Sequence, residues 1–162
     1  MAVSNVSTIG GDTWQLLNTA TVSSTTSSVS ISIAGATYKK IAVLVQGLTG
    51  TANYKPRIQF NNDTTSGNYG CGGITIDGAN VVYGVDDSVW MGSIQNVSNW
   101  SSYMEFGNCD QASPKPMTYI GTPWSTSFQG AWFGTAAISS VQISPSTGSL
   151  TAGTIKIYGI PS

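Results

Sequence analysis

Apolar and polar residues alternate with a period of two along much of this chain. The clearest case is Val29-Ser30-Ile31-Ser32-Ile33, in which one parity is apolar and the other carries hydroxyls. A period of two is typical of a half-buried antiparallel strand. Similar short segments recur about every 8–12 residues, and helical periodicity is almost absent. The pattern therefore predicts an all-β chain, a single-domain antiparallel β-sandwich of about ten short strands.

The expected strands cover residues 14–17, 29–33, 38–46, 57–60, 74–77, 81–85, 88–94, 101–106, 117–121, 128–133, 139–143 and 154–158. Residues 41–45 are apolar throughout. This run predicts a central strand buried on both faces, or a strand whose outer face meets another subunit. Residues 74–77 and 81–85 are expected to pair as a hairpin. The glycine-rich residues 70–73 are interpreted as a flexible or bulged start of a strand.

Residues 61–69, Asn-Asn-Asp-Thr-Thr-Ser-Gly-Asn-Tyr, carry side chains that hydrogen-bond their own backbone. They predict a structured turn. Their oxygens also suit calcium, but no second carboxylate is near Asp63, and the turn is a sufficient explanation. Cys71 and Cys109 are interpreted as two small buried hydrophobic residues rather than a disulfide.

The sequence divides into an N-terminal arm, residues 1–13, and a β-sandwich domain, residues 14–162. The arm is rich in apolar and hydroxyl side chains, and we expect it to lie along a neighbouring chain by strand addition. It shows neither the basic nor the apolar region of a signal peptide, so synthesis in a cytoplasm is expected. No apolar run approaches the roughly 20 residues that span a bilayer, so no membrane partner is expected.

The composition is poor in catalytic side chains. The chain has no histidine, a single glutamate (Glu105), and only 8% charged residues with a net charge of −1. Histidine is the usual general base and metal ligand, so we expect no enzyme, no catalytic residues, no metal and no cofactor. The six basic residues form no cluster, which argues against nucleic acid as a partner. A net charge near zero favours a protein that works within an assembly.

Aromatic side chains are the candidates for recognition. Trp100, Tyr103 and Trp124 lie among Asn, Ser, Thr and Gly, and tyrosine and tryptophan in such surroundings suit a sugar- or protein-binding surface. The alternative is that they fill the core of the sandwich, and this reading is preferred for Trp14 and Trp132. For Trp100 and Trp124 both readings stay open.

Several segments together resemble a known class of protein. They include Trp14-Gln15-Leu16-Leu17, Tyr38-Lys39-Lys40-Ile41, the turn after Phe60, residues 136–143 and the ending at residues 150–160. In this order they resemble small virion proteins of tailed bacteriophages, both capsid decoration (cement) proteins and tail-fibre domains. The resemblance implies a jelly-roll sandwich, a homotrimer, and no catalytic residues to carry over.

Two roles follow from the resemblance. The first is a capsid decoration protein that binds the major capsid protein on the outer surface of the assembled virion and stabilises the shell by mass action. The alternative is a tail-fibre or receptor-binding module that recognises host surface glycans. A secreted carbohydrate-binding module of cellular origin is a third hypothesis, and the expected lack of a signal peptide counts against it.

Overall fold

The computed structural model describes residues 13–33, 37–52, 54–74, 81–86, 88–90, 99–122 and 126–162. These residues form twelve strands and no helix, so the all-β prediction is confirmed. The strands are β1 (Gln15–Val22), β2 (Val29–Ser32), β3 (Tyr38–Gly50), β4 (Pro56–Phe60), β5 (Tyr69–Ile74), β6 (Val81–Asp86), β7 (Val89–Trp90), β8 (Trp100–Gly107), β9 (Lys115–Thr122), β10 (Thr126–Trp132), β11 (Ser140–Pro145) and β12 (Leu150–Pro161).

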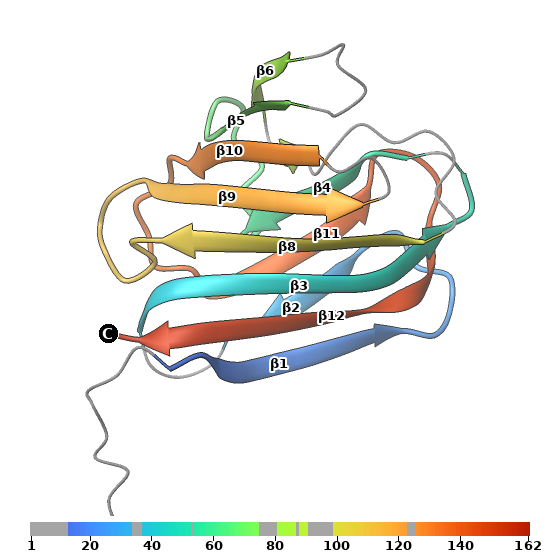
Figure 1. Cartoon of the computed structure of the whole chain (residues 1–162), viewed down its shortest axis with the longest axis horizontal. Coiled ribbons are helices and arrows are strands. Elements are labelled where there is room, and N and C mark those ends of the chain that lie inside the picture. Colours follow the sequence, from blue (N-terminus) through green and yellow to red (C-terminus); the bar gives the residue numbers. More distant parts are fainter. Residues whose placement is uncertain are drawn as a thin grey trace, which may run out of the picture.

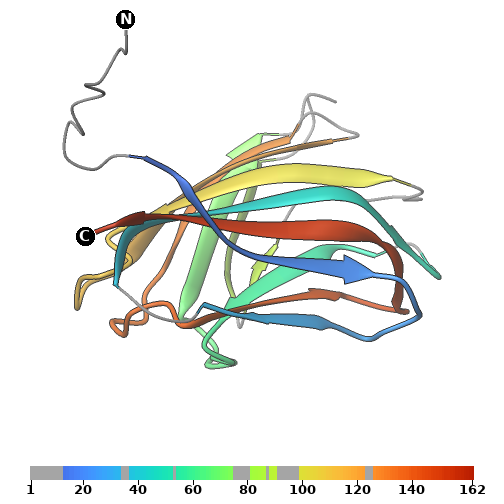
Figure 2. The same ribbon diagram turned by 90° about the horizontal axis from the view of Figure 1, so that it is seen from below.

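The strands lie in two antiparallel sheets, which confirms the sandwich. The larger sheet has the order β1-β12-β3-β8-β9-β10-β5-β6, and the smaller has the order β2-β11-β4-β7. Figure 1 looks onto the larger sheet, with the smaller sheet behind it. Figure 2 shows the two sheets as separate layers, with β1, β12, β3 and β8 on one side and β2, β11 and β4 on the other.

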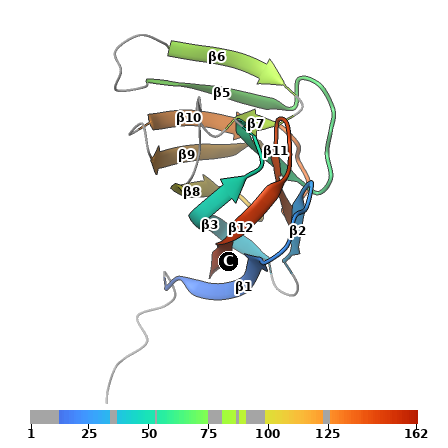
Figure 3. The same cartoon turned by 90° about the vertical axis from the view of Figure 1, so that its right-hand side faces the viewer.

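Eight of the strands follow jelly-roll pairing. Taken along the chain as β1, β2, β3, β4, β7, β8, β11 and β12, the first pairs with the eighth, the second with the seventh, the third with the sixth and the fourth with the fifth. This nested antiparallel pairing produces the two four-stranded sheets of a jelly roll. The remaining strands β9, β10, β5 and β6 continue the larger sheet beyond β8, as the end view in Figure 3 shows.

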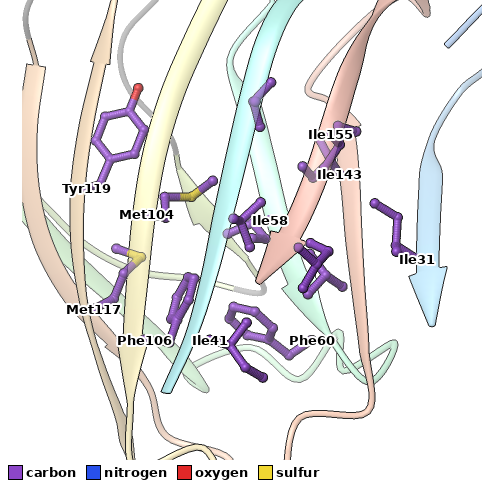
Figure 4. Packing of buried hydrophobic residues seen from close by; sticks show 14 of the residues in the cluster. Ile31, Ile41, Ile58, Phe60, Met104, Phe106, Met117, Tyr119, Ile143 and Ile155 are labelled. Atoms are coloured by element: carbon purple, nitrogen blue, oxygen red, sulfur yellow. The ribbon is translucent and has the colours of Figure 1, made fainter. Parts of the chain in front are cut away.

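The core fills the space between the sheets because alternate side chains of each strand point inward. In β8 the pattern of buried and more exposed positions alternates along the whole strand, and β9 alternates in the same way. Figure 4 shows the packing that results. The labelled core side chains are Ile31, Ile58, Phe60 and Ile143 from the smaller sheet and Ile41, Met104, Phe106, Met117, Tyr119 and Ile155 from the larger.

The interpretation of residues 70–73 as a bulged or flexible segment is wrong. These residues form the middle of β5, whose register with β10 is continuous from Tyr69 to Ile74. The glycines allow close backbone approach. A Cβ added to Gly73 would lie 2.3 Å from the carbonyl oxygen of Ser127 on β10. β5 pairs with β6, with Ile74 opposite Val81. The rest of the first strand of the hairpin predicted from residues 74–77 and 81–85 lies outside the described residues.

The turn after β4 is structured as predicted. The Asp63 carboxylate accepts hydrogen bonds from the Thr65 backbone (3.0 Å) and from the Asn68 amide (2.8 Å). Asn61 and Asn62 adopt left-handed backbone conformations, which asparagine tolerates better than most residues. Both cysteines are buried and neither is in a disulfide, as expected. Apart from Thr13, the N-terminal arm lies outside the described residues.

Candidate interaction surface

The outer face of the smaller sheet is polar along β2, β11 and β4. Its outward side chains include a lateral row of Ser30, Gln142 and Gln59, which the strand registers place side by side. The Gln142 amide donates a hydrogen bond to the Ser30 hydroxyl at 3.2 Å. The other described outward residues of these strands are Ser32, Arg57, Ser140 and Ser144. A face of this composition is suited to contact with water.

The larger sheet has a different outer face, here defined by the outward side chains of β1, β12, β3, β8, β9 and β10. Leu44, Tyr103 and Ile120 lie side by side on three adjacent strands and form what we call the apolar row. Ile120 is 64% exposed and Tyr103 is 38% exposed, while Leu44 is half-buried. Leu16 at the edge of the same face is also exposed. Cross-strand neighbours of this kind interact directly, so the row is a continuous apolar stripe.

A polar cluster lies next to the apolar row. The Lys40 ammonium donates a hydrogen bond to Glu105 Oε1 at 2.7 Å, and the Tyr103 hydroxyl donates one to Glu105 Oε2 at 3.0 Å. The hydrogen bond from Lys40 is the main cause that lowers the pKa of Glu105. Partial burial, with the hydrogen bond and the charge of Glu105, raises the pKa of Tyr103 to about 12. The cluster is therefore a carboxylate held between a cation and a neutral phenol.

The structure distinguishes among the three aromatic residues predicted for recognition. Tyr103 lies on the outer face and is exposed, as that role requires. Trp100 does not lie on the outer face. It points into the core with only 1% exposure, and its indole donates a hydrogen bond to the Tyr119 hydroxyl at 3.2 Å. Its prediction as a surface residue is wrong. Trp124 falls in the connection between β9 and β10, outside the described residues. Trp132 is buried as predicted, and Trp14 is half-buried.

Sequence reasoning missed Leu44 and Ile120. A weak signal for Ile120 was present, because it occupies the outward parity of β9, between the outward Thr118 and Thr122. An apolar residue on an otherwise hydroxylated parity is the sign of an exposed contact residue. Leu44 was included in the apolar run of β3, but only the structure shows that it faces outward beside Tyr103.

The described residues include no group arranged for a metal ion. Among them no group of three or more His, Cys, Asp or Glu side chains is placed to hold a metal ion. Asp63, the candidate for calcium, already has its second carboxylate oxygen in hydrogen bonds from Asn68 and from the Trp132 indole. No helix long and apolar enough to cross a membrane occurs in the described part of the chain.

Comparison with known proteins assigns the chain to no family. No protein-family model matches the sequence, and no curated protein matches it. A solved structure to which the chain is similar is that of an exo-inulinase from Aspergillus awamori, with 10% identity and a TM-score of 0.48. The similarity covers 94% of this chain and 30% of the enzyme, so the chain spans less than a third of its length.

Proposed function

We propose that this chain is a non-catalytic structural protein of a phage virion, a capsid decoration protein that binds the outer surface of the assembled capsid. The observation that carries the proposal is the contrast between the two outer faces of a jelly roll. The outward residues of β2, β4 and β11 on one face are polar, and the other face bears the apolar row beside a charged cluster. A contact face on one side and a water-compatible face on the other suit a protein that is layered onto a shell.

Further support comes from composition and sequence pattern. A net charge of −1 on 162 residues leaves little electrostatic repulsion between copies, which favours close packing in an assembly. The sequence segments that resemble phage virion proteins include β1, the turn after β4 and β12. A decoration protein binds the assembled lattice and not free subunits, so it stabilises the lattice by mass action.

Binding to purified capsids tests this proposal. Expanded capsids mixed with increasing amounts of the chain are pelleted, and the bound chain is quantified per capsid. We expect saturation at a fixed stoichiometry and a higher capsid melting temperature with the chain bound. Whole host cells, the matched control, should bind none. Absence of saturable binding to capsids would contradict the proposal.

A second candidate, a tail-fibre or receptor-binding module for host glycans, is favoured by one observation. Tyr103 is an exposed aromatic ring on a flat sheet, with the Glu105 carboxylate beside it, and sugar rings stack on such side chains. Under this alternative the chain binds a glycan array or host cells, and Tyr103→Ala or Trp124→Ala abolishes binding. Gln142→Ala on the opposite face is the control and should leave binding unchanged.

A further inference from the structure

Lys156 and Tyr103 flank β3 on the outer face of the larger sheet. Through the strand registers, Lys156 on β12 neighbours Leu44 on β3, and Leu44 neighbours Tyr103 on β8. Adjacent strands are about 4.8 Å apart. Lys156 and Tyr103 are therefore about equally far from Leu44, on opposite sides of β3 and at the same level along it.

Lys156 is an unused cation on this face. In the described part of the chain it has no hydrogen bond and no carboxylate within ion-pair distance. Glu105, by contrast, lies one outward position beyond Tyr103 on β8. It accepts one hydrogen bond at each oxygen, from Lys40 and Tyr103. A carboxylate oxygen has capacity for more than one donor, so Glu105 can accept a further cation.

We propose that the outer face binds a second copy of this chain, with a two-fold axis that runs parallel to β3 past Leu44. The rotation places Lys156 of each copy over Tyr103 of the other, within reach of Glu105. One contact is thus formed twice, as a two-fold interface requires. Each contact joins an ammonium to an aromatic face and a carboxylate. Charge complementarity therefore selects a second copy as the occupant of this face.

The residues near the axis suit this pairing. Leu44 is the outward residue of β3 that meets its own copy there, because the neighbouring Ala42 is only 2% exposed. Lys40 also lies on β3, but its ammonium is held at 2.7 Å by Glu105 on the β8 side of the axis. The two Lys40 charges are therefore drawn away from each other. In the dimer, Leu44 gives the apolar run of residues 41–45 a subunit contact, which is one of the two environments that its composition predicts.

This inference concerns the isolated chain, because the dimer covers the same face that is proposed to contact the capsid. It also differs from the homotrimer that the phage resemblance implies, because a two-fold axis relates the two copies. The contact lies at the centre of a sheet face and includes no extended groove. We therefore expect a reversible dimer whose population rises with concentration.

Sedimentation equilibrium of the purified full chain tests the dimer. Lys156→Glu turns both symmetric attractions into repulsions with Glu105, so the dissociation constant should rise at least about tenfold. The double variant Lys156→Glu with Glu105→Lys exchanges the two charges of each contact, so the dissociation constant should return to within about threefold of its original value. Lys55→Glu makes the same change in net charge at an exposed position outside this face and should have no effect.

Thermal melting of each variant confirms that it is folded. If the double variant does not fold, Leu44→Glu replaces it, because two carboxylates at the axis should leave only monomer. A chain that stays monomeric up to about 1 mM would overturn the proposal. A trimer, or a dimer whose mass does not respond to Lys156→Glu and Leu44→Glu, would also overturn it. The experiment is done without capsids. If no dimer forms, the proposed binding to capsids can therefore still be tested separately.

Discussion

The indole Nε1 of Trp132 donates a hydrogen bond to Oδ2 of Asp63 at 2.8 Å. This contact joins β10, in the extension of the larger sheet, to the turn that follows β4 of the smaller sheet. Tyr69 at the start of β5 reinforces the junction, because its hydroxyl donates to the Asp63 carbonyl at 3.0 Å and accepts from the Phe60 backbone at 2.9 Å. The turn therefore connects the strands that extend the larger sheet, β10 and β5, to the jelly roll by hydrogen bonds.

The first prediction concerns acid stability. Partial burial alone would raise the pKa of Asp63, but hydrogen bonds from Trp132, Thr65 and Asn68 outweigh it and lower the pKa from 3.8 to about 2. The unfolded chain has the higher pKa, so the carboxylate stabilises the fold fully above about pH 4. This stabilisation is lost as the pH falls towards 2.

Asp63→Asn should therefore lower the free energy of unfolding at pH 7 by about 1–2 kcal/mol and by much less at pH 2. Urea unfolding at several pH values measures the difference between the variant and the natural chain. Comparing the two removes the contribution of the other carboxylates. An equal loss of stability at pH 7 and pH 2 would show that the charge of Asp63 is not responsible.

The second prediction tests the close approach of β5 and β10. A Cβ added at Gly130 would lie 2.2 Å from the carbonyl oxygen of Gly70, a backbone atom that cannot move aside without breaking the ladder. Gly130→Ala should therefore cost about 2–4 kcal/mol of stability. Gly107→Ala in β8 is the matched control, because its Cβ would lie 3.5 Å from Pro116, an ordinary contact. Thermal unfolding that shows equal losses in both variants would contradict this account.

The sequence predicts best those strands that bury one face. β2, β4 and β11 alternate because their outward residues are hydroxyls, amides or Arg57 and their inward residues are apolar. β5 could not be predicted in this way, because its glycines show no alternation of apolar and polar side chains. Its pairing depends on close backbone contact with β10, and the hydrophobic pattern of the sequence contains no information on that contact.

The candidate surface was only partly predictable. Tyr103 was recognised from its local composition. Trp100 was not placed correctly, although it shares a parity with Met104 and Phe106, and this parity would have indicated burial. The apolar row could not be found from sequence, because Leu44 and Ile120 join Tyr103 through strand registers that depend on the whole fold.

The third prediction concerns the cysteine thiols. Burial is the main cause that raises the pKa of Cys109 to about 12, and Cys109 is 2% exposed while Cys71 is 7% exposed. A protonated, buried thiol does not react with disulfide reagents. We expect a chromogenic disulfide reagent to label neither cysteine at pH 8 in the native chain and both in guanidinium chloride. Fast labelling of either residue in native buffer would contradict the burial.

The fourth prediction separates the two aromatic residues of β8. Trp100→Ala removes a core side chain and leaves the Tyr119 hydroxyl without its indole donor, so it should cost about 3–5 kcal/mol of stability. Tyr103→Ala removes an exposed ring on the opposite face and should change stability by less than about 1 kcal/mol. Chemical unfolding of the two variants provides the comparison. If the Trp100→Ala chain were as stable as the Tyr103→Ala chain, Trp100 would not be a core residue.

The last prediction concerns Lys115, which is fully buried without a carboxylate partner among the described residues. Its ammonium donates to the carbonyls of Gln111 (2.7 Å) and Ser113 (2.6 Å). It also contacts the carbonyls of Gly134 and Thr135, each at 3.4 Å. The Trp132 ring lies below it, with the ammonium 5.6 Å from the ring centroid. One cation thus holds together the loop before β9 and the loop after β10.

Lys115→Met keeps most of the side-chain volume but leaves these carbonyls without their donor. The loss should be about 2–5 kcal/mol, because buried unsatisfied polar groups each cost on the order of 1–3 kcal/mol. Lys55→Met removes the same charge from an exposed side chain and should have almost no effect on stability. Hydrogen exchange should show faster opening in residues 111–113 and 134–135 of the Lys115 variant. Unchanged exchange there would mean that the ammonium does not hold the two loops together.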